Sequence, residues 1–106
     1  MMNNASAPYR SCRILLSKKT QKFLKSIPSK QRDLLFDKLD LLIAGSPLLD
    51  IKKLQGYQFL YRLRVADYRI VFEPDIQKNI VYVVIIAHRR EVYDNLSRLA
   101  VGNDFH

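Results

Sequence analysis

Three arginine-containing motifs are the part of this sequence best suited to chemistry on an anion. They are "YRLR" at 61–64, "DYR" at 67–69 and "HRREVY" at 88–93. The planar guanidinium of arginine can donate two hydrogen bonds to one phosphate and stays protonated at physiological pH. The last motif directly follows the most apolar run of the chain, "IVYVVIIA", where packing alone gives no reason to gather cations. The motifs therefore predict a site for a phosphate-bearing ligand, with the tyrosine of "HRREVY" beside it.

A β-hairpin brings the first two motifs together. Strands that turn at Ala66–Asp67 place Arg64 directly opposite Arg69, and Arg62 faces the same way because side chains alternate along a strand. Like charges directly opposite each other destabilise a sheet. A polyanion bound to this face would relieve that repulsion.

The alternative reading is a solvated basic face with acidic neighbours. The local acids are Asp67, Glu73 and Glu91, too few to neutralise the whole group of arginines. Lys52 and Lys53 add a basic connector suited to a nucleic-acid backbone. We assign these two lysines, together with Arg90, to nucleic-acid binding and not to chemistry.

The remaining sequence supplies the elements that position these motifs. Apolar spacing and turn residues predict, in order, a strand at 9–17, helices at 17–27 and 29–44, a connector at 46–57, strands at 59–65, 67–73 and 79–87, and a helix at 91–99. This order is typical of an α+β domain, with a helical hairpin on one face of a small, mostly antiparallel twisted sheet and a short C-terminal helix. We expect a single domain over residues 1–106, with disorder at 1–8 and 102–106.

Composition narrows the class of protein. Eighteen Lys and Arg against ten Asp and Glu give a net charge of +8, which suits nucleic acid, an anionic membrane or an acidic protein partner. No apolar run is long enough to span a bilayer, and the N-terminus lacks a signal-peptide core, so a cytoplasmic location without membrane attachment is expected. The single cysteine, Cys12, is read as a structural thiol. Glycine-rich phosphate loops, Cys/His metal spacings and paired helical carboxylates are missing, so no metal or cofactor is expected.

Residues 50–95 resemble the RelE branch of the RelE/ParE superfamily of bacterial toxins. The resemblance is carried by "LRVADYRIVFE" and "VYVVIIAHRREVY". It implies a toxin of a type II toxin–antitoxin system that enters the ribosomal A site and cuts mRNA, using the ribose 2′-OH as nucleophile on its adjacent phosphate without a metal. It also implies a cognate RelB-like antitoxin as partner, and contact with operator DNA only through the antitoxin complex.

The same resemblance assigns roles to individual side chains. The basic positions of the family's active surface correspond to Arg62, Arg64, Arg69 and Arg89, and its tyrosine corresponds to Tyr93. Arg69 and Arg89 are expected to hold the phosphate and its developing charge. Tyr93 is expected to stack on a base or to orient the 2′-OH.

One departure from the family concerns the proton acceptor. The best-known members carry lysines where this chain has Arg62 and Arg64, and arginine cannot give up its proton to become a base. His88 is the neighbouring side chain whose unperturbed pKa suits proton transfer near neutral pH, so it is a candidate catalytic base.

Three other functions compete with this interpretation. A ParE-like toxin would share the fold and the basic surface but poison DNA gyrase by binding it. A plain basic RNA-binding module would show a steep salt dependence and no cleavage product. A protein bound to anionic membranes ranks last, because no helix combines a basic polar face with an apolar face larger than the core requires.

Overall fold

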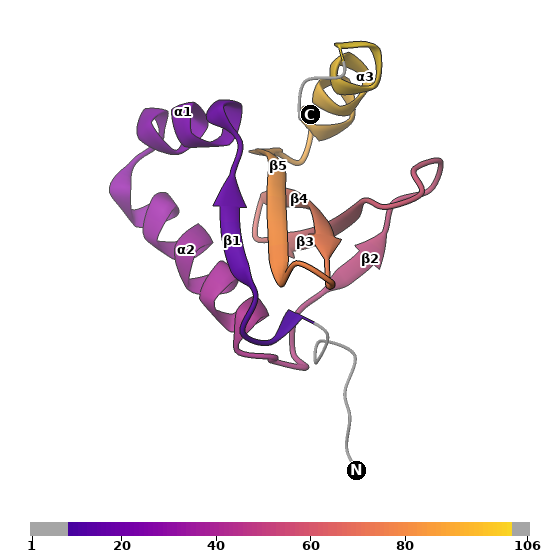
Figure 1. Ribbon diagram of the computed structural model, residues 1–106. Coiled ribbons are helices and arrows are strands. Elements are labelled where there is room, and N and C mark those ends of the chain that lie inside the picture. The colour runs from indigo at the N-terminus through magenta and orange to yellow at the C-terminus, as the bar shows by residue number, and fades with distance from the viewer. Residues whose placement is uncertain (1–8, 103–106) are drawn as a thin grey trace.

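The computed structural model describes the backbone of residues 9–102 and the side chains of residues 9–98 (Figure 1). The disorder expected at 1–8 and 102–106 falls outside these residues except at Gly102, which is the last residue of α3. The helices are α1 (Lys18–Ser26), α2 (Ser29–Ile43) and α3 (Val92–Gly102). The strands are β1 (Arg13–Leu16), β2 (Ile51–Lys53), β3 (Tyr61–Val65), β4 (Tyr68–Asp75) and β5 (Ile80–His88). They form one sheet in the order β1-β5-β4-β3-β2, so the predicted α+β fold is confirmed.

The helical hairpin forms where the sequence places its start and stop signals. The Ser17 side chain caps α1 by accepting a hydrogen bond from the Thr20 backbone N–H at 3.1 Å. Pro28 separates the two helices, since its ring is incompatible with a helix interior. Gly45, at φ +80°, follows the end of α2 in the left-handed conformation that glycine adopts most readily.

The predicted β3–β4 register is confirmed. The two strands are antiparallel and joined by Ala66–Asp67, with Arg64 paired to Arg69 and Arg62 paired to Val71. β5 is an interior strand between β4 and the edge strand β1, and β4 is the central strand. Its burial on both faces is what its continuous apolar sequence predicts.

The two faces of the sheet carry separate cores. The core between the sheet and the helical hairpin includes Leu35 and Leu42 of α2 and Leu63 and Phe72 of the strands, all fully buried. The opposite face carries a smaller core in which α3 packs through Val92 and Leu96. The helical hairpin and α3 therefore lie on opposite faces of the sheet.

Several element boundaries differ from the sequence-based prediction. Residues 9–12 form a turn, so β1 begins four residues late, and β3 begins at Tyr61 and not at residue 59. The predicted connector contains β2, a strand too short to leave a clear periodic pattern. Pro74 does not end β4, which continues to Asp75. The last β3–β4 pair is Tyr61 with Phe72, so Pro74 lies beyond β3, where a missing strand neighbour makes proline tolerable.

Candidate nucleic-acid interface

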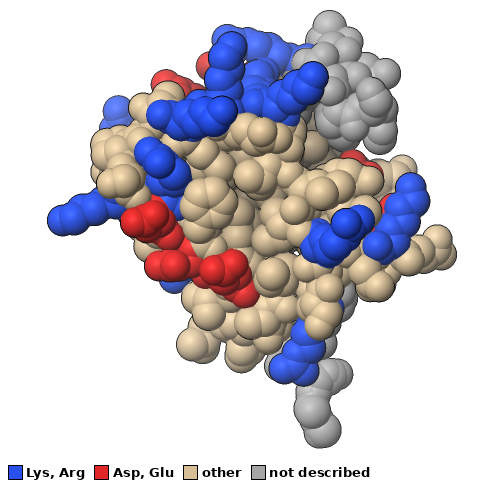
Figure 2. Space-filling view, turned by 60° about the vertical axis from the view of Figure 1, so that its left-hand side comes forward, with Lys and Arg blue, Asp and Glu red and all other residues tan. Residues whose placement is uncertain are grey.

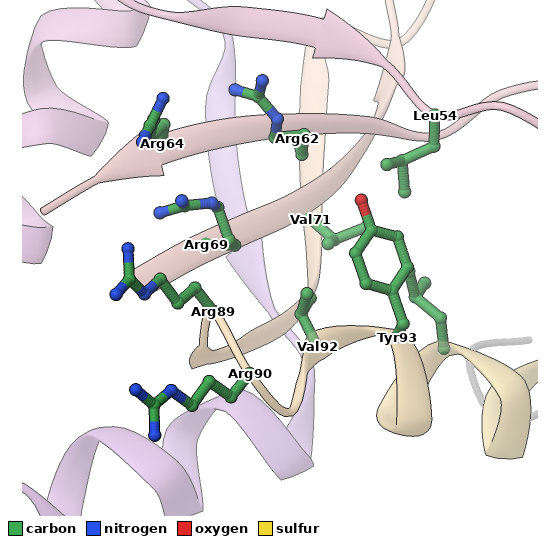
Figure 3. A pocket seen from close by; sticks show the side chains of 10 residues that line it. Leu54, Arg62, Arg64, Arg69, Val71, Arg89, Arg90, Val92 and Tyr93 are labelled. Atoms are coloured by element: carbon green, nitrogen blue, oxygen red, sulfur yellow. The ribbon is translucent and has the colours of Figure 1, made fainter. Parts of the chain in front are cut away.

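A cavity of about 510 Å³ lies between the strands and α3, on the sheet face opposite the helical hairpin (Figure 3). One part of its lining is cationic and the other is apolar, and no described Asp or Glu belongs to it. The lining residues are Leu54, Arg62, Arg64, Arg69, Val71, Arg89, Arg90, Val92, Tyr93 and Leu96. The three sequence motifs therefore meet around one cavity.

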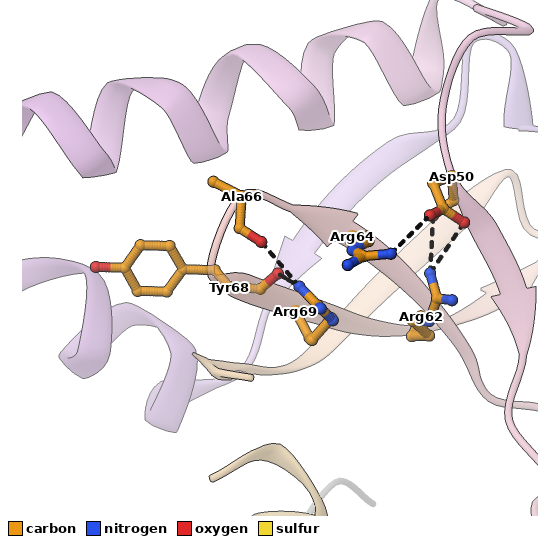
Figure 4. Close-up of polar contacts among 6 residues, drawn as sticks. All are labelled: Asp50, Arg62, Arg64, Ala66, Tyr68 and Arg69. Carbon is orange, nitrogen blue, oxygen red and sulfur yellow. Dashed lines mark hydrogen bonds and ion pairs between the residues drawn. The ribbon is translucent and has the colours of Figure 1, made fainter. Parts of the chain in front are cut away.

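The turn between β3 and β4 organises the cationic part (Figure 4). The Arg69 Nη1 group donates hydrogen bonds to the Ala66 carbonyl at 3.0 Å and to the Tyr68 carbonyl at 2.8 Å. The Arg89 backbone N–H donates to the Asp67 carbonyl at 2.7 Å. Carbonyls at this turn thus hold the guanidinium of Arg69 and the backbone of Arg89.

Arg69 lies at the electropositive centre of the group. Partial burial lowers its pKa from the ordinary arginine value, and the charges of Arg64, Arg62 and Arg89 lower it further. The guanidinium stays charged at neutral pH because arginine begins from a pKa far above that range. Among the described residues Arg69 has no ion-pair partner, so a phosphate is the natural counter-charge.

Asp50 is an acidic residue of this region that the sequence analysis missed. Its Oδ1 accepts a hydrogen bond from Arg62 Nη1 at 3.1 Å, and its Oδ2 lies 3.8 Å from Arg64 Nη1 (Figure 4). The hydrogen bond from Arg62 is the main cause that holds the pKa of this carboxyl below its usual value. Asp50 does not line the cavity. It pairs with two arginines from the rim of the cavity. Asp50 was not predicted because the three-residue strand β2 that follows it is too short to leave a periodic pattern.

The other acids considered as counter-charges contribute little. Asp67 Oδ1 is 3.9 Å from Arg89 Nε, and both side chains are about half exposed or more. Solvent screening makes such a pair weak. Glu73 and Glu91 form no ion pair with any described residue.

The apolar part of the cavity surrounds Tyr93. The side chain of this residue is 64% exposed and extends from the first turn of α3 toward the strands (Figure 3). Leu54, Val71 and Val92 form the apolar wall beside it. An exposed aromatic ring next to phosphate-binding cations can stack on a nucleobase, because every base presents a π-face.

His88 lies on the other face of the sheet. Its strand partner is Tyr68, and the two rings are 6.2 Å apart in an edge-on contact. Tyr68 also contacts Phe23 of α1, with ring centroids 6.0 Å apart. Ala87, one residue earlier, is the one that pairs with Arg69. His88 therefore lies on the other face from Arg69, although its Nδ1 accepts a hydrogen bond from the Arg90 backbone N–H at 3.4 Å.

The predicted backbone-binding residues divide between the two faces. Lys52 pairs with Arg62 and shares its face, and Arg90 lines the cavity. Lys53 pairs with Tyr61, lines a smaller cavity of about 240 Å³ and donates to the Tyr57 carbonyl at 3.2 Å. Lys52 and Arg90 can thus contact a strand in the main cavity, and Lys53 cannot do so from its position.

The described residues offer neither a metal site nor a membrane-spanning helix. Within them, no three or more His, Cys, Asp and Glu side chains are grouped closely enough to hold a metal ion. None of the described helices is both long and apolar enough to cross a bilayer.

Similarity to known proteins identifies the family and agrees with the fold. The family model described as the ParE toxin of the type II toxin–antitoxin system parDE matches residues 14–93. Toxin RelE3 of Methanocaldococcus jannaschii is 33% identical over 86 residues, which cover 77% of this chain and 96% of that protein. The chain therefore belongs to the RelE/ParE superfamily of type II toxin–antitoxin toxins.

Solved structures point to the RelE branch of that superfamily. The archaeal RelE–RelB complex of Pyrococcus horikoshii contains a chain with a TM-score of 0.63 and 25% identity, covering 74% of this chain and 96% of that one. The RelB–RelE complex of Methanococcus jannaschii gives a TM-score of 0.58 and 31% identity, covering 76% of this chain and 96% of that one. This protein is thus a RelE-family toxin.

Proposed function

We propose that this toxin is a ribosome-dependent mRNA endoribonuclease. The observation that carries the proposal is the single cavity in which five arginines face an exposed tyrosine with no described acid in its lining. Such a cavity suits one nucleotide step of an RNA strand, with the phosphate among the arginines and a base against Tyr93. The arginines most suited to the phosphate are Arg69 and Arg89, since the β3–β4 turn holds the guanidinium of the first and the backbone of the second.

The reaction requires charge stabilisation more than a cofactor. The ribose 2′-oxygen forms a bond to the adjacent phosphorus, and the bond from phosphorus to the 5′-oxygen of the next nucleotide breaks. The 2′ proton leaves to a base, and the departing 5′-oxygen takes up a proton. Negative charge rises on the phosphoryl oxygens during this step, where preorganised guanidinium groups stabilise it most.

The cavity does not supply a group that can accept the 2′ proton. Arginine does not act as a base at physiological pH, and His88 faces away from the cavity. We therefore assign proton removal to a group of the ribosome, and assign to this chain the binding, orientation and charge stabilisation of the phosphate. Dependence on the ribosome follows, because the isolated protein lacks one part of the machinery.

The proposed partners follow from the same cationic face. RelE chains of the archaeal relatives form complexes with RelB. A RelB-like antitoxin with acidic segments would silence this toxin by covering the arginines. Neutralising their charge in this way would also prevent RNA from binding. Contact with operator DNA would then occur only through that complex, and the site of action is the cytoplasm, where ribosomes and mRNA meet.

The deciding experiment is cleavage of a defined mRNA by the purified protein, with and without programmed ribosomes. We expect cuts only with ribosomes, and a loss of at least about 100-fold in rate for Arg69→Ala, comparable to removing one oxyanion-stabilising donor. Arg13→Ala is the matched control, because Arg13 is an exposed arginine of β1 outside the cavity. Equal rates for the two variants would contradict the proposed site.

A ParE-like action is the second candidate, because the matching family model is named for ParE. Growth arrest without mRNA cleavage under any condition, together with inhibition of purified DNA gyrase, would favour it. In that case Tyr93→Phe and Arg69→Ala would change the affinity for gyrase, and neither the wild type nor the variants would cleave RNA.

A further inference from the structure

Helix α1 carries a second basic surface that neither the cavity nor the sequence motifs include. Its four lysines are all exposed, and the helix contains no acidic residue. None of them forms an ion pair with a described residue. We call this the α1 lysine surface, made of Lys18, Lys19, Lys22 and Lys25.

The position of these lysines destabilises their own helix. Lys18 and Lys19 occupy the first turn of α1, where the helix dipole favours acidic side chains and the structure has none. Lys22 follows Lys18 by four residues and Lys19 by three, so like charges are neighbours on the helix surface. On a face exposed only to solvent, mixed charges would stabilise the helix more than lysines alone. A bound polyanion would offset the repulsion among the lysines.

The α1 lysine surface adjoins the end of β5 that supplies the cavity arginines. Phe23 of α1 contacts Tyr68, which in turn contacts His88, the residue before Arg89 and Arg90. Figure 2 shows basic side chains gathered along the upper edge of the face that carries α1, with acidic side chains lower down over α2. On this face, basic side chains are therefore gathered most densely at the end that carries α1, and others are scattered elsewhere (Figure 2).

We propose that the α1 lysine surface binds the phosphate backbone of a structured RNA while the cavity holds a separate single strand. The inference rests on the proposed function, because it extends the same RNA contact beyond the cavity. From Lys18 to Lys25 the helix rises about 10 Å, so the lysines can follow a backbone over several phosphates. Lysine suits this role because its compact charge on a flexible stem binds phosphate without demanding one geometry.

The test compares two triple variants of equal charge. Lys18→Gln/Lys22→Gln/Lys25→Gln removes the α1 lysine surface. Arg13→Gln/Lys38→Gln/Lys78→Gln removes three cations from β1, α2 and the β4–β5 turn. Binding is measured at several salt concentrations to a tetranucleotide, which reports on the cavity, and to a hairpin RNA, which reports on the α1 lysine surface. Both RNAs carry 2′-O-methyl groups, so that neither can be cut.

We expect the α1 variant to bind the hairpin about 10–100-fold more weakly than the wild type near 0.1 M salt, with the slope of log K against log salt reduced by about 2. Its tetranucleotide binding stays unchanged, and the control variant keeps the wild-type slope for both RNAs. Equal losses in the two triple variants would overturn the proposal, since they would show a general effect of net charge. Loss of binding to anionic phosphatidylserine vesicles with unchanged hairpin binding would also overturn it, in favour of a membrane surface.

A second variant controls for folding. Lys18→Glu/Lys19→Glu places acids in the first turn of α1, so its thermal midpoint should rise while hairpin binding falls. A variant that is more stable and still binds the hairpin like the wild type would overturn the proposal. Failure of the wild type to bind the tetranucleotide would instead count against the proposed function of the cavity, and the hairpin measurement would be unaffected.

Discussion

The two faces of the sheet serve opposite physical purposes. The face under α1 and α2 is closed, with Leu63, Ile70 and Phe72 fully buried against the helices. The other face is closed only where α3 packs, and its remaining part exposes arginines, two of which are directly opposite each other on neighbouring strands. The larger buried core favours folding, whereas like charges on the open face oppose it, so we infer that the closed face supplies most of the stability. Substitutions on the two faces should therefore separate folding from activity.

The largest effect is expected on the closed face. Phe72→Ala removes a fully buried ring that contacts Tyr9 edge-on at 5.5 Å and stacks with Tyr61 at 5.9 Å. The free energy of unfolding should fall by about 3–5 kcal/mol, a large part of the total for a domain of this size. Urea denaturation measures the change. A loss below about 1 kcal/mol would show that the closed face is not the main source of stability.

A variant of the open face should change activity and stability in opposite directions. Arg64→Thr removes one member of the like-charged pair with Arg69 and leaves a residue suited to a strand. Cleavage should fall by about 10–100-fold, while the free energy of unfolding rises by about 0.2–1 kcal/mol. Cleavage assays and urea titrations on the same preparation measure both. A drop in both quantities would mean that Arg64 contributes to the fold, against the division between the faces.

Asp50→Asn should change RNA affinity and stability on the open face by less than Arg64→Thr does. Without the carboxylate, Arg62 and Arg64 are released toward the cavity, and RNA affinity should rise a few-fold with a salt slope steeper by about 1. The pKa of Asp50 is lowered in the folded state, so its charged form stabilises the fold above the ordinary aspartate pKa, and this contribution is lost as pH falls through the lower folded value. The stability difference between wild type and variant should therefore disappear on acidification toward pH 2. A difference that persists there would mean that the carboxylate charge is not its source.

The smallest effect is expected for His88→Gln. His88 is on the closed side of the sheet beside Tyr68, so cleavage by the variant should stay within about twofold of the wild type and show the same dependence on pH. A rate profile measured from pH 5.5 to 8.5 provides the test. A large loss in which an inflection near the ordinary histidine pKa also vanishes would restore His88 as the base.

The sequence predicted the open face well because short-range rules determine it. A two-residue turn and strict alternation were sufficient to align Arg62, Arg64 and Arg69, and the strand register confirms this. The same alternation also places His88 on the other face, one residue after Ala87. That consequence depends on knowing that β5 extends to residue 88, and strand ends are the least certain part of a prediction from pattern.

Long-range packing determines the features that the sequence did not predict. The apolar half of the cavity joins Leu54, Val71 and Leu96 from three distant segments, and nothing local links them. Asp50 precedes a strand of three residues, too short to be distinguished from a loop. The α1 lysine surface was visible as charge, but its continuity with the arginines depends on ring contacts between α1 and β4.

The turn at Ala66–Asp67 is a place where a small mutation can inactivate the toxin without unfolding it. Ala66 adopts φ +51°, a left-handed conformation that costs a residue other than glycine about 1–2 kcal/mol, and its carbonyl holds Arg69 while the next carbonyl holds Arg89. Lengthening this turn by one residue would displace both arginines at once and leave the closed core intact. Cells selected to survive expression of the toxin should therefore accumulate small in-frame insertions at this turn, producing a folded, harmless protein that still occupies its antitoxin.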